Sequence, residues 1–355
     1  MSAALPDELS NALRASDRSA YFEQRIFVLS PFGFPATTAL IFVLLIGTLA
    51  IALSISNVPI LTQVHGRTAV EYIVLLGGWF CLMNTVVLAM QRYSRLKERA
   101  DLPAFAQVLR GGWASAAQLT ELTPVGAPLV FATLIGLALG IGLSWLFYVR
   151  GTDNLTGSPF LLVWFFFATT LIITLFTRGV ALTRSANRGF RQTMDSELII
   201  DLLRIDRLSV IGRSAARVAL IWFTVSAVMF LAFIGGGVTL FTMALIFGAC
   251  AIGAWVFLST MEYVHLKIRA AKAAEMEVLR GEIETIRPRT GHESDAAQRL
   301  QGLLAFEKRI ADAPEWPFDQ PTLVRMFASP LILTVPWFGQ AIAATLVEHL
   351  GHIPG

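Results

Sequence analysis

Long apolar stretches without charged residues alternate with charged stretches along this chain. Four such runs lie at 36–55, 72–91, 122–149 and 154–177. A bilayer core about 30 Å thick needs roughly 20 apolar helical residues. In lipid, each backbone polar group must also find its partner within the protein, so an apolar run of this length must be helical. The four runs therefore predict four membrane-spanning helices, and Pro128 is expected to start the third, since proline suits a first helical turn.

A fifth uncharged stretch, at 218–261, is too long for one crossing. Three consecutive glycines at 235–237 divide it, because glycines supply a tight turn without side chains to place. The stretch thus predicts two more helices. The pattern as a whole predicts six spans arranged as three consecutive hairpins.

The last apolar run, 327–347, holds 21 uncharged residues and is long enough to span the bilayer. Asp319 can cap a helix here and Pro321 can occupy its first turn. Pro336 falls in the middle of the run and is expected to remove a hydrogen bond and kink the helix. We expect a kinked seventh crossing, with a re-entrant or interfacial element as the alternative.

The segment after the sixth predicted span has a coiled-coil spacing. Its apolar residues Met276, Leu279, Ile283 and Ile286 follow a 3-4-3 pattern. The stretch PRTGHESD at 288–295 interrupts the pattern, and a second apolar seam follows from Leu300 to Ile310. The short break predicts an antiparallel helical hairpin, although each helix could instead pair with a neighbouring subunit. We regard the four residues of the first seam as a candidate partner surface.

A further amphipathic segment precedes the fifth predicted span. Leu198, Ile199, Leu202, Leu203 and Ile205 form an apolar face beside charged residues. This pattern is typical of a helix that lies at the membrane interface.

Together these patterns place the chain in the all-α class. The expected fold is a polytopic transmembrane helical bundle of six spans plus a kinked seventh, with a cytoplasmic helical hairpin. The expected parts are a cytoplasmic N-terminal segment, the six-helix bundle, the cytoplasmic hairpin and the C-terminal membrane helix, at 1–35, 36–260, 261–320 and 321–355.

Composition and charge agree with this class and orient the chain. Apolar residues make up 55% of the 355 residues and charged residues only 15%, whereas soluble domains carry about 25% charge. All 28 lysines and arginines except Arg67 and Arg150 fall on one side of the predicted bundle. Because cytoplasmic loops carry the excess of positive charge, the N-terminus is expected in the cytoplasm. The same asymmetry explains the basic pI without a nucleic-acid partner.

The sequence offers little that is typical of an enzyme. It lacks a phosphate-binding P-loop, an HExxH zinc motif and a Gly-x-Ser-x-Gly elbow. Cys81 and Cys250 do not form a CxxC pair, and no cofactor is expected.

The candidate polar pathway consists of Glu71, Asn84, Thr170, Thr174 and Thr177. Asn84 needs a partner in hydrocarbon, through either an interhelical hydrogen bond or a polar pathway. The three threonines share one helix face and either line a pore or bond back to their own helix. Gly136, Gly140 and Ser144 form a face of small residues that predicts close helix packing.

The C-terminal stretch EWPFD at 315–319, followed by Thr322, Leu323, Arg325, Pro330 and the LVE at 346–348, resembles the tail of uncharacterised polytopic inner-membrane proteins of Gram-negative bacteria. This resemblance implies a bacterial inner-membrane location and no particular activity.

From the sequence we expect a non-enzymatic membrane protein, a scaffold, sensor or assembly factor that acts through its cytoplasmic hairpin. The expected contacts are the lipid bilayer and a protein partner or second copy at the hairpin. The alternative is an oligomeric channel or transporter.

Overall fold

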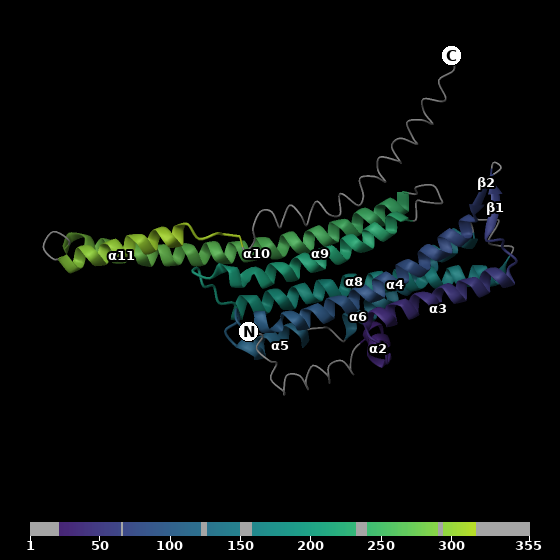
Figure 1. The fold of residues 1–355 in the computed structure, drawn as a ribbon, viewed down its shortest axis with the longest axis horizontal. Helices are drawn as coiled ribbons and strands as arrows, with labels where there is room; N and C mark the ends of the chain where they lie inside the picture. Colours follow the sequence, from purple (N-terminus) through teal and green to yellow (C-terminus); the bar gives the residue numbers. More distant parts are fainter. Residues whose placement is uncertain are drawn as a thin grey trace, which may run out of the picture.

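The computed structural model describes residues 21–64, 67–121, 126–149, 158–231, 240–289 and 294–316, and almost all of them are helical. The α-helices are α2 (Phe22–Leu29), α3 (Phe34–Ile55), α4 (Tyr72–Phe105), α5 (Gly112–Glu121), α6 (Ala127–Ser144), α8 (Pro159–Glu197), α9 (Ser209–Phe230), α10 (Leu240–Ile286) and α11 (Ser294–Ala311). The long helices run side by side in an elongated bundle (Figure 1).

Six of these helices, α3, α4, α6, α8, α9 and α10, are long and apolar enough to cross a membrane. They coincide with the six predicted spans, so the expected all-α polytopic bundle is confirmed. Large apolar side chains such as Val43 and Val163 are more than 60% exposed, which is the usual state of a side chain that faces lipid. The chain is therefore a multi-pass membrane protein. Pro128 lies in the first turn of α6, as expected.

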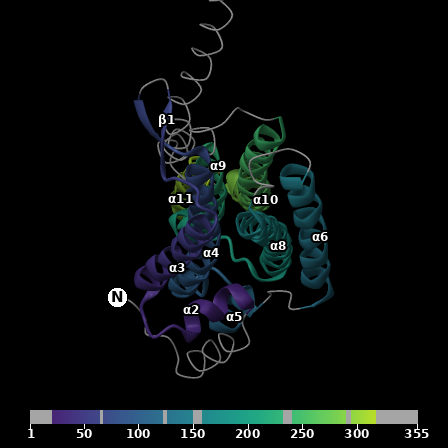
Figure 2. The ribbon, with the colours of Figure 1, turned by 90° about the vertical axis from the view of Figure 1, so that its right-hand side faces the viewer.

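Consecutive spans pack as hairpins: α3 on α4, α6 on α8 and α9 on α10. Viewed along the bundle, α6 lies at the outside against α8, and α3 lies on the opposite side beside α4 (Figure 2). Helix α4 also contacts α8 and α9, so it joins the three hairpins together.

The bundle has two main apolar cores. One lies among the spans and includes the fully buried Met83, Leu161 and Phe165. The other lies beyond one end of the apolar parts of the spans and includes Leu102, Met194, Ile211 and Ile268. The second core exists because α4, α8 and α10 continue as helices beyond their apolar runs instead of ending there.

A small β-ribbon joins α3 to α4 at the end of the bundle opposite α11, and the sequence pattern did not predict it. Strands β1 (Leu61–Val64) and β2 (Arg67–Val70) pair antiparallel. The backbone N–H of Glu71 donates to the carbonyl of Ile60 at 3.0 Å, which closes the ribbon just before α4 begins.

The predicted interfacial helix at 198–205 is wrong. Helix α8 ends at Glu197, and a non-helical segment follows until the short 3₁₀ helix η2 (Ile205–Leu208). The backbone of Ile199 donates instead to the carbonyl of Val108 at 2.9 Å, and the Asp201 carboxylate accepts from the N–H of Leu203 at 3.0 Å. Leu198, Leu202 and Ile205 pack on the second core, whereas Ile199 and Leu203 are exposed. Local side-chain bonding takes the place of the helix.

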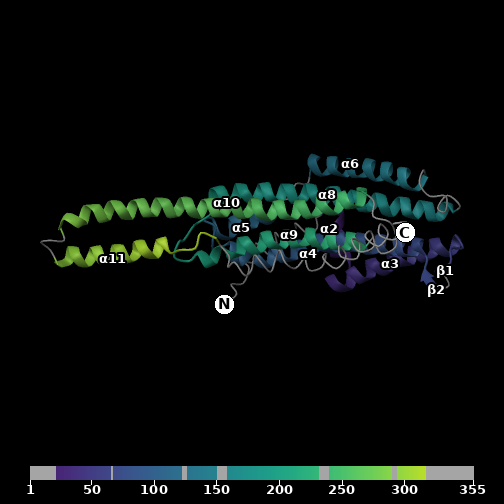
Figure 3. The same ribbon diagram turned by 90° about the horizontal axis from the view of Figure 1, so that it is seen from above.

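The predicted hairpin is present. Helix α10 has 47 residues, and α11 runs back along its distal part (Figure 3). The short 3₁₀ helix η4 (Arg287–Arg289) follows α10 at the predicted break, and Ser294 begins α11. The expected boundary near residue 260 falls inside the continuous α10. The predicted glycine turn at 235–237 and the predicted seventh helix lie outside the described residues.

Candidate functional sites

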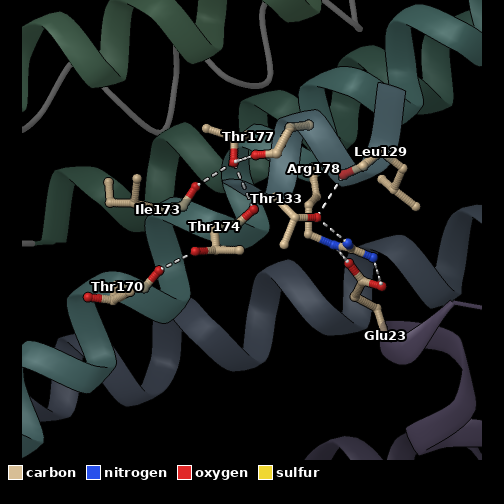
Figure 4. Close-up of polar contacts among 9 residues, drawn as sticks. Glu23, Leu129, Thr133, Thr170, Ile173, Thr174, Thr177 and Arg178 are labelled. Carbon is tan, nitrogen blue, oxygen red and sulfur yellow. Dashed lines mark hydrogen bonds and ion pairs between the residues drawn. The ribbon is translucent and has the colours of Figure 1, made fainter. Parts of the chain in front are cut away.

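Thr170, Thr174 and Thr177, which we call the threonine stripe, lie on the side of α8 that faces α6 (Figure 4). The hydroxyl of Thr174 donates to the carbonyl of Thr170 at 2.7 Å, one turn earlier in the same helix. The hydroxyl of Thr177 is 2.9 to 3.1 Å from the carbonyls of Ile173 and Thr174 in α8 and of Ala132 in α6. These hydroxyls are therefore satisfied by backbone carbonyls, one of them across the helix pair.

Glycines of α6 bring its backbone against this stripe. A Cβ atom at Gly140 would lie 2.7 Å from the Cα of Thr170, and one at Gly136 would lie 2.7 Å from the Cα of Thr174. Real Cβ atoms do not approach other atoms this closely. The predicted small-residue face of Gly136, Gly140 and Ser144 thus packs on α8. A pore along the threonines would require α6 to leave this position, and their role in a polar pathway stays a prediction.

A buried ion pair stands at the end of the stripe, and the sequence reading missed it. The Arg178 guanidinium of α8 contacts the Glu23 carboxylate of α2 in two places, with Nη2 2.8 Å from Oε2. The Glu23 side chain is fully buried. Arg178 Nη1 donates to the Thr133 hydroxyl at 2.6 Å, and this hydroxyl donates to the carbonyl of Leu129 at 2.7 Å. One arginine therefore ties α2, α6 and α8 together (Figure 4).

Asn84 lies in the middle of α4 and is 1% exposed. Its side-chain nitrogen donates to the carbonyl of Phe80 at 2.9 Å and to the carbonyl of Ala168 in α8 at 3.3 Å. The second contact is an interhelical hydrogen bond, one of the two interpretations predicted for this residue. Its Oδ1 has no hydrogen-bond partner within the described ranges. The residue borders an apolar groove of about 360 Å³ between α3, α4 and α8.

Glu71 stands apart from the other candidate polar residues. It is half-buried immediately before α4, and its side chain does not cap that helix. Asn84 lies 13 residues further along α4, about 20 Å away by helical rise. The threonine stripe faces α6, whereas Asn84 lies between α4 and α8. The described structure therefore brings Thr170, Thr174 and Thr177 together but does not join them to Glu71.

The hairpin seam lies between α10 and α11. Leu279 is 5% exposed, and Met276, Ile283 and Ile286 are half-buried. In α11, Ile310 is 1% exposed. Because α11 covers the seam, these four residues could receive another protein only if α11 moved away, and their role as a partner surface stays a prediction.

The base of the hairpin is fixed by polar and aromatic contacts. Lys272 donates to the carbonyls of Ala311 at 2.6 Å and Ala313 at 3.1 Å. The ring of His265 stacks on Trp316 with centroids 4.4 Å apart. Arg280 pairs with Glu307 further along the hairpin, with 3.4 Å between Nε and Oε1. These contacts hold α11 against α10 in one register.

In the parts of the chain that the structure describes, no three His, Cys, Asp or Glu side chains gather where they could hold a metal ion. Comparison of the chain with protein-family models, curated proteins and solved structures finds no match.

Proposed function

We propose that this protein is a non-enzymatic membrane scaffold that binds a partner protein through the α10–α11 hairpin. We place it in the bacterial inner membrane, with the N-terminus and the hairpin in the cytoplasm. The asymmetry of lysine and arginine supports this orientation. The resemblance of the C-terminal stretch supports the bacterial location, and the absence of catalytic motifs from the sequence supports a non-enzymatic role.

The continuity of α10 carries this proposal. The helix passes without interruption from the bundle into the hairpin, over 47 residues. From Lys267 to Ile286 it extends about 30 Å by helical rise. A helix that only connects a membrane span to a loop has no need for this length, or for the contacts that hold α11 against it. The hairpin projects beyond the other helices as a continuation of α10 (Figure 3).

The outer face of α10 suggests where the partner binds. On the side opposite the seam lie the exposed, uncharged residues Ala270, Ala274, Val278, Gly281 and Thr285, which we call the outer stripe. Their 4-4-3-4 spacing keeps them on one helix face. Val278 is 61% exposed, and a Cβ atom at Gly281 would touch nothing within 4 Å. A solvated helix face usually carries charge, so an uncharged stripe of this length favours contact with another helix.

Charge defines the chemistry of the partner. Four glutamates, Glu275, Glu277, Glu282 and Glu284, are exposed on the same part of α10. A partner helix with bulky apolar residues facing the outer stripe and lysines or arginines on its flanks would match both features. A second copy packed through this face would bring glutamates against glutamates, which disfavours self-association here.

Site-specific photo-crosslinking in cells tests the proposal. A photoreactive phenylalanine analogue at position 278 should give one specific cross-linked protein, and the same analogue at the outward-facing position 298 of α11 should not. Ala274→Glu should abolish the product, since it places a charge in the contact, whereas Ala297→Glu on α11 should leave it unchanged. The captured protein should then bind purified parent protein and bind the Ala274→Glu variant at least tenfold more weakly.

Two results would overturn the scaffold proposal. One is a cross-link from position 278 that Ala274→Glu does not reduce. The other is an ion conductance in liposomes containing the purified protein, which would favour the alternative of a channel or transporter. If the cross-linked product consists of two copies of this chain, the partner is a second copy and not a different protein.

A further inference from the structure

An elongated cavity of about 210 Å³ runs along the bundle between α4, α8 and α9. Its lining extends from Val87 to Phe105 on α4 and from Leu175 to Phe190 on α8, more than 20 Å of helix on each side. The cavity therefore begins among the apolar parts of the spans and continues to the level of the second core.

The lining changes from apolar to polar and back along this length. Val87, Leu175 and Val225 line the end within the spans. Polar side chains lie further along, namely Gln91, Ser94, Arg95, Thr183, Asn187 and Ser214, and we call them the polar belt. Leu102 and Phe105 line the other end. An occupant must therefore be an amphiphile, with its tail among the spans and its polar group at the belt.

The amide of Gln91 gives the belt an open hydrogen-bond donor. Its Nε2 is buried and has no hydrogen-bond partner among the described residues. Buried polar atoms are rarely left unpaired, because a buried donor that has lost its bond to water and gained no other destabilises the fold. Gln24 bonds to the main-chain carbonyl of Gln91 at 3.1 Å, so the side-chain amide is not needed for that contact.

The charges of the lining are already matched. Arg95 pairs with Glu98, with 3.5 Å between Nη1 and Oε2, and contacts the Tyr21 hydroxyl at 3.3 Å. The Ser94 hydroxyl donates to Glu98 at 2.8 Å. Arg95 and Glu98 are only partly buried, at 20% and 31% side-chain exposure, and because their charges compensate each other the lining offers no net charge to an ionic head group. What it offers is an N–H donor to a neutral acceptor.

We propose that this cavity binds an uncharged lipid that carries an apolar tail and a carbonyl-bearing polar group, with the carbonyl oxygen accepting from Gln91 Nε2. Glyceride esters and quinones both have this chemistry. The cavity lies outside the hairpin, so a variant that abolishes lipid binding here does not test the binding of a partner protein by the hairpin.

Gly179 provides the variant that fills the cavity. It lies on the cavity face of α8, where an added Cβ would have Gln91 Nε2 at 3.7 Å and Trp222 at 4.0 Å as its nearest neighbours. Both are ordinary contact distances, so Gly179→Ala should fit and Gly179→Leu should extend into the space. Gly142 on the lipid-exposed side of α6 is the matched control, because a Cβ there touches nothing within 4 Å.

The experiment uses full-length protein in phosphatidylcholine vesicles that contain diacylglycerol with a diazirine in its acyl chain. After illumination, the parent and Gly142→Leu should be labelled at cavity-lining residues of α4 and α8. Labelling of these residues in Gly179→Leu should be at least fivefold weaker than in the parent. Gln91→Leu should weaken it roughly three- to tenfold, the change expected for one hydrogen bond. Thermal unfolding of each variant shows whether the fold is kept. If Gly179→Leu does not fold, the labelling of Gln91→Leu tests the proposal instead.

Competition identifies the source of the carbonyl group. If excess unlabelled diacylglycerol removes the labelling and a short-chain quinone does not, the ligand is a glyceride. If the quinone removes the labelling at a lower concentration than diacylglycerol does, the ligand is a quinone. Equal labelling of the parent and a folded Gly179→Leu overturns the proposal, as does labelling confined to lipid-facing residues. If an anionic phosphatidic acid probe labels the cavity to the same extent as the diacylglycerol probe, the proposal that the ligand has an uncharged head group is wrong.

Discussion

Helix α8 meets its neighbours in two different ways, and glycine has opposite effects in the two contacts. On the α6 side, Gly136 and Gly140 remove side chains so that the two backbones touch. On the side of α4 and α9, Gly179 removes a side chain and the neighbours do not close on it. The first contact has no space for a methyl group, whereas the second borders a cavity of about 210 Å³.

The polar groups of the two contacts differ in the same way. The Thr174 and Thr177 hydroxyls on the α6 side reach carbonyl oxygens, and the Thr170 hydroxyl lies 3.5 Å from the Ser144 hydroxyl of α6. On the other side, Gln91 Nε2 and Asn84 Oδ1 lack partners within the described ranges. Buried polar atoms rigidify a contact when all are satisfied, and those without a partner are sites where another group can bind. We therefore regard the α6 contact as structural and the α4–α9 side as the part of the bundle open to ligands.

The largest expected effect comes from the ion pair beside the α6 contact. Arg178→Leu leaves the fully buried Glu23 carboxylate without its partner, and breaking a buried pair in this way costs about 3–5 kcal/mol. We expect a loss of this size in the free energy of unfolding, measured by denaturant titration in detergent. The double variant Glu23→Leu with Arg178→Leu should recover most of it, since no unpaired charge remains. Equal destabilisation by the single and double variants would contradict a charge effect.

The next effect tests the backbone contact itself. Gly140→Leu forces a side chain against the Cα of Thr170, and overpacking of this kind costs about 1–3 kcal/mol or more. Gly142→Leu, two residues along the same helix, makes the same substitution at an exposed position and should be neutral or stabilise the protein by up to about 1 kcal/mol, the gain in helix propensity. Both variants gain the same helix propensity, so their difference in unfolding free energy measures the packing alone. Equal stability of the two would show that α6 is free to move away from α8.

The sequence predicted the spans well because lipid imposes a strict rule on every backbone polar group. The apolar runs at 36–55 and 72–91 became α3 and the first part of α4, and Pro128 starts α6 as expected. The small-residue face of Gly136, Gly140 and Ser144 also predicted a packing surface correctly, because glycines at a four-residue spacing lie on one helix face.

The sites were harder to predict, since they depend on contacts between distant segments. Glu23 and Arg178 are 155 residues apart, and no spacing rule pairs them. A glycine pattern does not say whether the neighbouring helix closes on it, so Gly140 and Gly179 look alike in sequence. The segment at 198–205 has helical periodicity, but its backbone pairs with 108–110, a contact that periodicity cannot reveal.

The smallest expected effect concerns Asn84 on the open side of α8. Asn84→Leu removes the hydrogen bonds to Phe80 and Ala168, and an interhelical hydrogen bond in a membrane is worth about 0.6 kcal/mol on average. It also removes the unpaired buried Oδ1, whose presence costs about 1–3 kcal/mol. The two contributions oppose each other, so the unfolding free energy should change by at most about 2 kcal/mol, towards stabilisation. Thr85→Val, one residue away and also buried, controls for the loss of a polar group that bonds only to its own helix. A destabilisation above about 2 kcal/mol would mean that the Asn84 amide holds α4 and α8 together, and the difference between the two sides of α8 would then disappear.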